Sequence, residues 1–352
     1  MMLSTELSSL LGLLSMGFLA WGSYPPLEQG LHDLLPITGD LVGQFKAFQI
    51  QYNKSYPDSA EEVHRFDIFV NNLARAQQLT KEHGGLAQFG VTQFSDLTEE
   101  EFRQLYQPSR HSYSYPRPKT GGHPRLQRSQ TPSCDWRKEK IMTPVRDQGR
   151  CNSCWAISAV SNVEALWAIK FQKHFNLSVQ ELLDCRRCGE GCEGDFAWEG
   201  FLTILNQSGL AKEEDYPYKA QSSPRGCQKK KKWAWIQDFI MLPKEEDYMA
   251  QYVAENGPIT VSINKKLLQL YTKGVIKPEN NCDPYHVDHS VLLVGFSRIR
   301  NFTYWILKNS WGSSWGEKGY FRLHRGSKAC GITKYPVTAL VGGAKATRRC
   351  PS

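Results

Sequence analysis

The sequence predicts an α+β fold of two lobes, a mainly helical lobe followed by a mainly β lobe. Directly after Cys154, apolar residues recur at steps of three and four, as the buried face of a helix requires (Ala156, Val160, Val163 and Trp167). Later in the chain, residues 259–263 and 289–294 alternate or stay apolar, which is typical of strands. We therefore expect residues 129–240 to form the helical lobe and residues 241–341 the β lobe.

Two further helical segments precede these lobes. Residues 41–52 are amphipathic, and residues 61–81 place apolar side chains at helical steps (Phe66, Phe69, Leu73 and Ala76). Residues from about 107 to 130 are rich in Pro, Ser, Arg, Tyr and Gly without periodicity, which is typical of an exposed, cleavable linker. From periodicity alone, this unit is interpreted as an ordinary helical N-terminal domain.

Residues 1–22 are predicted to be a signal peptide. The apolar run from Leu10 to Ala20 is too short to span a bilayer, and Ala20-Trp21-Gly22 has the small-x-small pattern of a signal-peptidase site. The segment departs from the usual pattern because it carries Glu6 and neither Lys nor Arg. Ten cysteines also fit an oxidising compartment. Four Asn-x-Ser/Thr triplets are candidate glycosylation sites, and they begin at Asn53, Asn176, Asn206 and Asn301.

Composition and charge narrow the classes of partner. The 40% of apolar residues suffices for large cores, and the net charge of +8 is moderate and spread along the chain. Apart from the leader, no segment is long and apolar enough to predict a transmembrane helix. Lys229 to Lys232, followed by Trp233 and Trp235, form a basic-aromatic stretch. Polyanion binding is one interpretation of it, but such a run more often marks a solvated loop, and we expect no nucleic-acid partner.

Three residues form a candidate catalytic set. Cys154 lies at a predicted helix start, where unpaired backbone N–H groups and the positive end of the dipole favour the nucleophilic thiolate. His289 begins a β-rich run, and Asn309 precedes Ser310-Trp311-Gly312. A lone cysteine or histidine is more often a structural core residue, but their joint occurrence with Asn309 favours catalysis.

The motifs around these residues resemble the papain family of cysteine proteases, and the resemblance covers nearly the whole chain. It rests on Gln148–Trp155, Gln180–Cys185, Trp235–Phe239, Val287–Gly295 and Trp305–Gly312. In that family the His and Asn follow the Cys by roughly 130–150 residues, the spacing given for papain-like proteases. Here they follow by 135 and 155 residues, and the overshoot at Asn309 is what a loop insertion would produce.

The N-terminal unit resembles the propeptide of the same family. The skeleton Glu61-x3-Arg65-x3-Phe69-x2-Asn72-x3-Ala76 and the stretch Gly90–Asp96 follow its two motifs in order. The resemblance implies a papain-like two-lobe fold, with a β-barrel-like second lobe, preceded by a helical inhibitory propeptide at 23–128. The mature peptidase would then be residues 129–352, with a C-terminal extension at 342–352, and the site would lie between the lobes.

The resemblance also implies a role for each residue of a cysteine endopeptidase that is made as a zymogen. His289 accepts the proton of Cys154, which gives a thiolate–imidazolium pair before substrate arrives. Asn309 orients His289, and Trp311 shields that bond from water and borders the bound substrate. Gln148 and the backbone N–H of Cys154 stabilise the oxyanion. A peptide bond is hydrolysed by thioester formation and then by attack of water.

Substrate-binding positions follow from the same resemblance, which implies Gly194, Asp195, Ser262 and Val287. Two residues depart from the family pattern. Asn152 stands where relatives have Gly, and its β-carbon can obstruct a close substrate approach. Asp195 replaces the second of two glycines, whose backbone pairs with an extended peptide. The alternative function is therefore a catalytically impaired papain-fold protein that binds peptides.

The family pattern implies three disulfides, with Cys154 left free: Cys151–Cys192, Cys185–Cys227 and Cys282–Cys330. Cys134, Cys188 and Cys350 then remain. Three cysteines cannot all pair within one chain, so one is reduced or links two chains, and the sequence does not choose among them.

Zinc and redox chemistry are the rival interpretations of the cysteines. Cys151-x2-Cys154 and Cys185-x2-Cys188 are two pairs, but the thirty residues between them exceed the roughly 15–20 usual for such zinc sites. A thioredoxin-like site requires a βαβ unit, and none is predicted before Cys151. We expect neither a metal nor a cofactor.

The resemblance implies peptide or protein substrates and the chain's own propeptide as intramolecular inhibitor, with cystatin-type proteins as candidate inhibitors of a monomer. For the most similar branch of the family it further implies cytotoxic lymphocytes as the setting. The location would be the secretory pathway, in the endoplasmic reticulum or lysosome-like granules.

Overall fold

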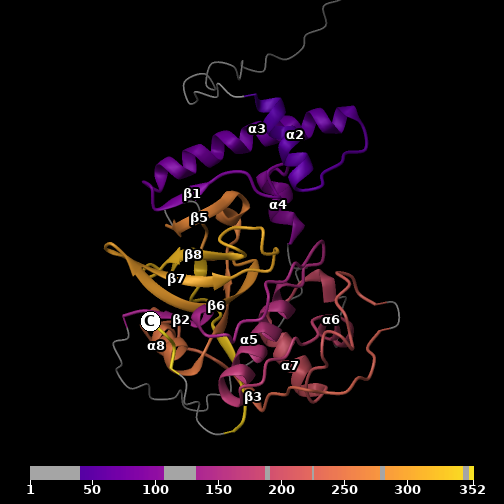
Figure 1. Cartoon of the computed structure of the whole chain (residues 1–352), viewed down its shortest axis with the longest axis vertical. Coiled ribbons are helices and arrows are strands. Elements are labelled where there is room, and N and C mark those ends of the chain that lie inside the picture. The colour runs from indigo at the N-terminus through magenta and orange to yellow at the C-terminus, as the bar shows by residue number, and fades with distance from the viewer. Residues whose placement is uncertain (1–39, 107–131, 187–190, 224–225, 278–281, 344–348) are drawn as a thin grey trace, which may run out of the picture. The chain divides into compact units, whose positions relative to one another are not determined.

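The computed structural model describes residues 40–106, 132–186, 191–223, 226–277, 282–343 and 349–352 (Figure 1). The predicted signal peptide, the whole of the predicted linker and Cys188 lie outside the described residues. In these ranges, the structure contains no helix with the length and apolar character that a bilayer crossing requires.

The N-terminal unit contains the two helices that the sequence predicts. Its elements are α2 (Leu41–Gln51), α3 (Ser59–Glu82), β1 (Ala87–Phe89) and α4 (Glu99–Leu105). Asp58 caps α3 by accepting the backbone N–H of Glu61, and Thr98 caps α4 in a reciprocal capping box. The small core between α2 and α3 is aromatic, with Phe45, Phe48 and Phe69 buried.

The propeptide-like motif residues hold this unit together. Arg65 donates to the carboxylates of Glu61 and Glu101 at 2.7 and 2.9 Å, and so joins α3 to α4. The buried Asn72 amide donates to the carbonyl oxygens of Ser95 and Leu97, both at 2.8 Å. The motif spacing thus places one face of α3 against the loop that leads into α4.

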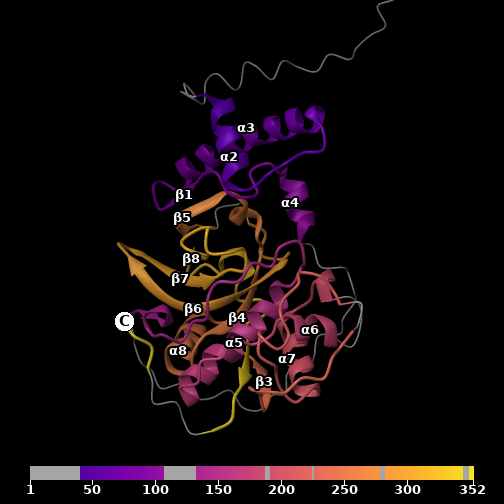
Figure 2. The same cartoon turned by 45° about the vertical axis from the view of Figure 1, so that its right-hand side comes forward.

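The helical lobe is built around α5 (Cys154–Phe171), which is buried along nearly its whole length. It packs against α7 (Ala197–Asn206) on one side and strand β6 on another (Figure 2). The short helix α6 (Gln180–Cys185) and a 3₁₀ turn at Gly191–Glu193 complete this part of the lobe. A helix that is apolar all round requires such burial on several sides.

The β lobe is a mostly antiparallel sheet. Along the described residues the strand order is β1-β5-β8-β7-β6-β4-β9-β3, and β2 pairs with β6. The bounds are β2 (Cys134–Asp135), β3 (Asp238–Met241), β4 (Ile259–Ile263), β5 (Tyr271–Ile276), β6 (His289–Ile299), β7 (Phe302–Lys308), β8 (Tyr320–His324) and β9 (Val337–Leu340). Helix α8 (Glu246–Asn256) packs on β6. Strand β1 of the N-terminal unit extends this sheet by pairing antiparallel with β5.

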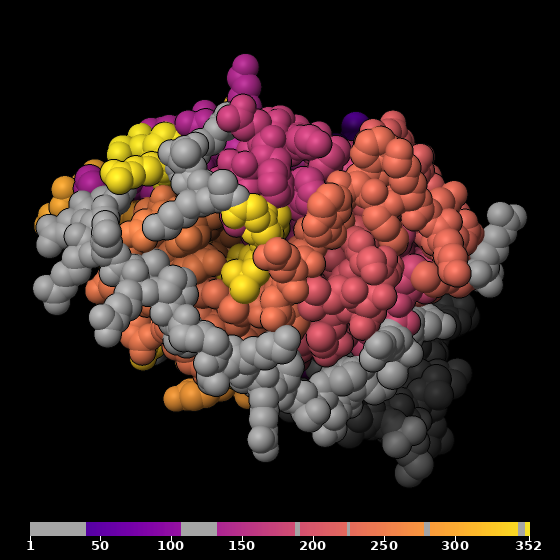
Figure 3. All heavy atoms as spheres, turned by 90° about the horizontal axis from the view of Figure 1, so that it is seen from below, coloured from indigo at the N-terminus to yellow at the C-terminus, as the bar shows by residue number. Residues whose placement is uncertain are grey.

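The core of each lobe also contains residues from a segment that is distant in the sequence. Trp136, within the predicted helical lobe, belongs to the core of the β lobe. Val337 and Ala339 of β9 belong to the core of the helical lobe. Seen from below, residues near the C-terminus lie at the surface between the two lobes (Figure 3, yellow). The two cores therefore share segments from both ends of the described chain, and the division at residue 240 stays a prediction.

The last described residues, 349–352, lie against β2. Cys350 forms a disulfide with Cys134, a pairing that the sequence left open. The backbone N–H of Asp135 donates to the carbonyl of Pro351 at 2.9 Å. The disulfide joins residues 216 positions apart, so it closes a long loop.

Candidate active site

Cys154 is the first residue of α5 and is 3% exposed. The N-cap residue Ser153 makes no side-chain capping bond, which leaves backbone N–H groups of the first turn free for a ligand. The thiol donates to the side-chain oxygen of Asn152, with 3.7 Å between Sγ and Oδ1. Burial raises the pKa of the Cys154 thiol to about 11.

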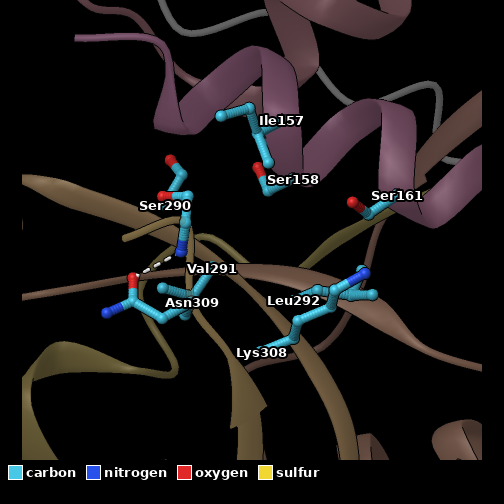
Figure 4. Close-up of a pocket in the computed structure, with 9 residues that line it drawn as sticks. Ile157, Ser158, Ser161, Ser290, Val291, Leu292, Lys308 and Asn309 are labelled. Atoms are coloured by element: carbon cyan, nitrogen blue, oxygen red, sulfur yellow. Dashed lines mark hydrogen bonds between the residues drawn. The ribbon is translucent and has the colours of Figure 1, made fainter. Parts of the chain in front are cut away.

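His289 begins β6, and its ring is fixed on two sides. Nε2 lies 2.7 Å from Oδ1 of Asn309. That oxygen also accepts the backbone N–H of Ser310 at 2.8 Å, the bond that is dashed in Figure 4. Because the Asn309 atom is an acceptor, Nε2 carries the proton and Nδ1 carries the lone pair. The ring stacks on Trp311 with centroids 4.8 Å apart.

Burial disfavours the charged form of both catalytic candidates. Burial lowers the pKa of His289 to about 3, although the bond to Asn309 acts in the opposite direction. Nδ1 of His289 has no hydrogen-bond partner among the described residues. The pKa of Cys154 is raised and the pKa of His289 is lowered, so both shifts disfavour the charged forms while the site is covered, and the thiolate–imidazolium pair stays a prediction.

Gln148 is fully buried, and both ends of its amide are held. Nε2 donates to the carbonyl of Cys151 at 3.0 Å, and Oε1 accepts the hydroxyl of Ser310 at 2.7 Å. The backbone N–H of Gln148 donates to the carbonyl of Ser310. A primary amide has a second N–H, so Nε2 retains one donor for a ligand.

Residues of the N-terminal unit cover this group. Phe94, Phe102 and Tyr106 have ring centroids 5.0, 5.8 and 5.9 Å from that of Trp311. The Tyr106 hydroxyl donates to the carbonyl of Gly149 at 3.0 Å. Cys154 and His289, which lie next to this covered group, are 3% and 2% exposed.

The negative charge of Asp195 is paired within the protein. Its carboxylate lies 2.5 Å from the Arg186 guanidinium, and the two side chains are 1% and 4% exposed. The other oxygen of Asp195 accepts the backbone N–H of Phe196 at 2.8 Å. The Arg186 guanidinium also lies over the Trp155 ring. Both charges are therefore compensated within the protein.

The remaining predicted substrate-binding residues lie around the same group. Gly194 is buried and has a φ of +85°, a conformation that favours glycine. Ser262 lies opposite Ser290 in the β4–β6 register, one residue from His289. Val287 is half-buried and lies two residues before His289.

A small cavity lies behind the site, between α5 and strands β6 and β7 (Figure 4). Its volume of about 10 Å³ holds no more than a water molecule. Lys308 lines it and donates to the carbonyl of Thr143 at 2.6 Å. Burial lowers the pKa of Lys308 to about 8. The cavity is too small for a peptide, so it supports the site and does not receive substrate.

Sequence reasoning did not identify Lys265 and Asp288, which form an ion pair beside His289 at 2.6 Å. Asp288 directly precedes His289, and this adjacency was the available signal. Lys265 gave none, because a lysine in the loop after a strand is usually solvated.

Of the cysteines that suggested a zinc site, Cys151 and Cys185 are joined in disulfides. The structure contains the three pairs that the resemblance implied: Cys151–Cys192, Cys185–Cys227 and Cys282–Cys330. Cys154 is the free cysteine of the described residues. Within those ranges, no group of three His, Cys, Asp or Glu side chains is placed to hold a metal ion.

The asparagines of the four candidate glycosylation triplets are all exposed: Asn53, Asn176, Asn206 and Asn301. The Asn176 side chain accepts a bond from Arg146 at 2.6 Å. Exposure leaves each of the four accessible to a glycan, and their use stays a prediction.

A nucleophile at a helix start and an imidazole held by an asparagine define a cysteine protease of the papain type. The family model "Papain family cysteine protease" matches residues 130–340, and "Cathepsin propeptide inhibitor domain (I29)" matches residues 45–102. The chain therefore belongs to the papain family of cysteine proteases and carries that family's propeptide.

Individual relatives agree with this assignment. Cathepsin W of Felis catus is 51% identical, with 97% of this chain and 96% of that protein covered. Cathepsin F of Mus musculus is 39% identical, covering 84% of this chain and 64% of that protein. This order matches the motifs, which resemble cathepsin W most and cathepsin F next. Among solved structures, the recombinant stem bromelain precursor is 30% identical, with a TM-score of 0.75. The comparison covers 86% of this chain and 99% of that chain.

Proposed function

We propose that the chain is a cysteine endopeptidase made as a zymogen, with Cys154 as nucleophile and His289 as its base. The observation that carries this proposal is the bond between His289 Nε2 and Asn309 Oδ1, because it leaves Nδ1 as the basic atom of a buried imidazole. Cys154, free of disulfides, provides the sulfur at the start of α5.

The reaction then follows from the roles of these groups. Nδ1 of His289 takes the thiol proton while Cys154 Sγ attacks the peptide carbonyl carbon. The oxyanion receives hydrogen bonds from the Cys154 backbone N–H and the remaining Gln148 amide proton. The imidazolium gives its proton to the leaving amine, and water then hydrolyses the thioester. Asn309 keeps the ring in the required tautomer throughout.

The propeptide maintains the inactive state in this proposal. Its residues Phe94, Phe102 and Tyr106 exclude water from the site, and burial disfavours both the thiolate and the imidazolium. Cleavage within the linker, between the propeptide at 23–128 and the peptidase at 129–352, hydrates the site and allows the ion pair to form. Cystatin-type proteins would compete for the same surface of a monomeric enzyme.

The compartment proposed is the secretory pathway, in the endoplasmic reticulum or a lysosome-like organelle. Disulfides are stable in such oxidising compartments, and four are present among the described residues. Peptide mapping of glycans at Asn53, Asn176, Asn206 and Asn301 tests whether the chain passes through the secretory pathway.

A second function, peptide binding without cleavage, is favoured by one observation. The Cys154 thiol donates to Asn152 Oδ1, whereas Nδ1 of His289 has no partner among the described residues. The amide at position 152 thus competes with the imidazole for the thiol proton. Asp195 gives this second function little support, because Arg186 neutralises it.

Covalent labelling separates the two functions. Full-length and mature protein are treated with an epoxide reagent and with iodoacetamide, and Cys154 is mapped by mass spectrometry across pH. The enzyme predicts rapid labelling of the mature form at mildly acidic pH, which the His289→Ala variant loses. In the full-length form labelling should rise only toward pH 11, because the raised pKa of the thiol keeps it protonated below that value. Mature protein that labels no faster than an ordinary thiol contradicts the enzyme and favours the binding protein.

A further inference from the structure

Lys265 is a buried lysine that the catalytic mechanism does not use. It follows β4 and is 1% exposed. Its ammonium donates to Asp288 Oδ2 at 2.6 Å, and its backbone N–H donates to Asp288 Oδ1 at 3.0 Å. Asp288 is bonded to His289 along the chain, so this ion pair is fixed beside the imidazole. A lysine is almost never buried without a partner, and the pair explains why this one is tolerated.

In this structure the propeptide accepts a hydrogen bond from the ammonium of Lys265. Nζ donates to the main-chain carbonyl of Arg103 at 3.1 Å, and it lies 5.8 Å from the centroid of the Phe102 ring. Both residues belong to α4 of the propeptide. An ammonium has three donors, and here one is given to the segment that covers the site and another to Asp288. When the propeptide leaves, the donor to Arg103 becomes free and Lys265 loses its cover.

The path of the same propeptide segment indicates on which side of the cleaved bond a substrate would contact Lys265. Beyond Arg103 it continues to Tyr106, which stacks on Trp311 and donates to the Gly149 carbonyl. A peptide that passes over Lys265 therefore also passes over Trp311, which stacks on His289. The imidazole of His289 must protonate the leaving amine. The part of the substrate that follows the cleaved bond therefore lies against Trp311 and Lys265.

We propose that Lys265 is a specificity-determining residue, and that the mature enzyme prefers peptides with an acidic residue directly after the cleaved bond. The proposal rests on the proposed function, because it assigns a substrate class to that same site. A carboxylate oxygen takes the place of the Arg103 carbonyl oxygen, and its negative charge adds an attraction to the ammonium that a neutral carbonyl oxygen lacks. Asp288 already satisfies part of the charge, so the expected preference is about 3-fold to 10-fold.

The charge of Lys265 also acts on the catalytic groups, which supports its placement. It lowers the pKa of the Cys154 thiol and the pKa of the His289 imidazole. Since both effects require proximity, an acidic residue held by Lys265 lies close to the reacting atoms.

The test compares pairs of quenched peptides that differ only in Glu or Gln directly after the cleaved bond. Mature enzyme is titrated for active sites, cleavage positions are mapped by mass spectrometry, and kcat/KM is measured for each peptide. The wild type should cleave the Glu peptide about 3-fold to 10-fold faster, with a smaller ratio at high salt because screening weakens the contact. Lys265→Met should bring the ratio to about one through loss of the Glu peptide alone, and Lys265→Arg should preserve it.

Two control variants separate charge recognition from other effects. Lys266→Met removes the adjacent lysine, which is 53% exposed and pairs with Glu99 of the propeptide, and should leave the ratio unchanged. Lys265→Met combined with Asp288→Asn avoids leaving Asp288 without its partner, and should also give a ratio near one. A wild-type ratio of one, or an equal ratio in wild type and Lys265→Met, overturns the proposal and leaves Lys265 as a contact for the propeptide only.

Failure of the proposed function gives a different result. In that case neither peptide is cleaved and Cys154 resists labelling. The affinities of the same two peptides for the Cys154→Ala variant then measure the preference without catalysis. Tighter binding of the Glu peptide that depends on Lys265 supports the inference, and equal binding of both peptides overturns it.

Discussion

On the β side of the site, Asn309 and Trp311 hold the imidazole of His289 in the tautomer and orientation that general-base chemistry requires. Asn309 accepts the Nε2 proton, and Trp311 covers that bond by stacking on the ring. On the helical side, formed by Cys154, Asn152 and Asp195, two residues stand where the family resemblance implies glycine. One of them bonds the nucleophile itself.

The comparison teaches that the two glycine replacements act differently. Asp195 brings a charge, but Arg186 compensates it within the protein. Asn152 brings no charge, yet its side-chain oxygen accepts a hydrogen bond from the thiol of Cys154. The imidazole has to remove the proton of that same thiol. The activity that we propose therefore depends on how well the imidazole of His289 competes with the side-chain amide of Asn152 for the thiol proton of Cys154.

Removal of the base from the β side has the largest expected effect. His289→Ala should lower kcat/KM about 10²-fold to 10⁴-fold, because general-base catalysis contributes that much. Steady-state kinetics of mature enzyme on a quenched peptide measures this loss. Unfolding temperatures of both proteins serve as the control for folding. Equal kcat/KM values in the variant and the wild type would mean that another group activates Cys154.

Loss of the oxyanion donor comes next and acts on the helical side. Gln148→Ala should lower kcat about 10²-fold to 10³-fold with little change in KM, since the bond forms only as charge develops on oxygen. The matched control is Ser310→Ala, which removes the hydroxyl that holds Gln148 Oε1 and leaves the donor in place. A loss in KM alone would show that Gln148 binds the ground state and does not stabilise the oxyanion.

Removal of the competing amide should increase activity, and this prediction tests the comparison most directly. Asn152→Gly should raise kcat/KM about 5-fold to 10-fold, because one hydrogen bond to the resting thiol is worth about 1 kcal/mol. The pH dependence of Cys154 alkylation should shift toward lower pH, because the thiolate forms more readily.

Asn152→Ala distinguishes the amide from its β-carbon. If competition for the proton is the cause, Ala and Gly should give similar gains. A gain with Gly alone would instead identify steric obstruction of the substrate by the β-carbon.

The residues that sequence analysis located are those whose signals are local. Apolar periodicity predicted α3 at 61–81, and the structure gives Ser59–Glu82. The motif around Cys154 predicted the start of α5, and the motif around His289 the start of β6. Such patterns depend on near neighbours in the chain, so they can be recognised without knowledge of the tertiary structure.

The features that the sequence did not predict arise from distant pairing. Arg186 compensates Asp195 only because the fold brings α6 and the turn after Cys192 together. Cys350 pairs with Cys134 because the C-terminal tail returns to β2, and spacing alone left three cysteines open. The burial of Lys265 depends on the propeptide lying across it. Each case requires a contact between segments whose separation carries no periodic signal.

The smallest expected effect on activity concerns Asp195. The variant Asp195→Gly with Arg186→Ala removes both charges, since loss of one partner alone leaves a buried charge and costs about 3–5 kcal/mol of stability. We expect kcat/KM to change by no more than about 3-fold, and the ratio between basic and acidic peptides to stay nearly constant, because the compensated pair presents little net field. Kinetics on peptides with Lys or Glu before the cleaved bond measures both quantities. A gain above about 10-fold in the double variant, with an altered Lys-to-Glu ratio, would show that Asp195 obstructs the substrate after all, and the helical side would then carry two defects.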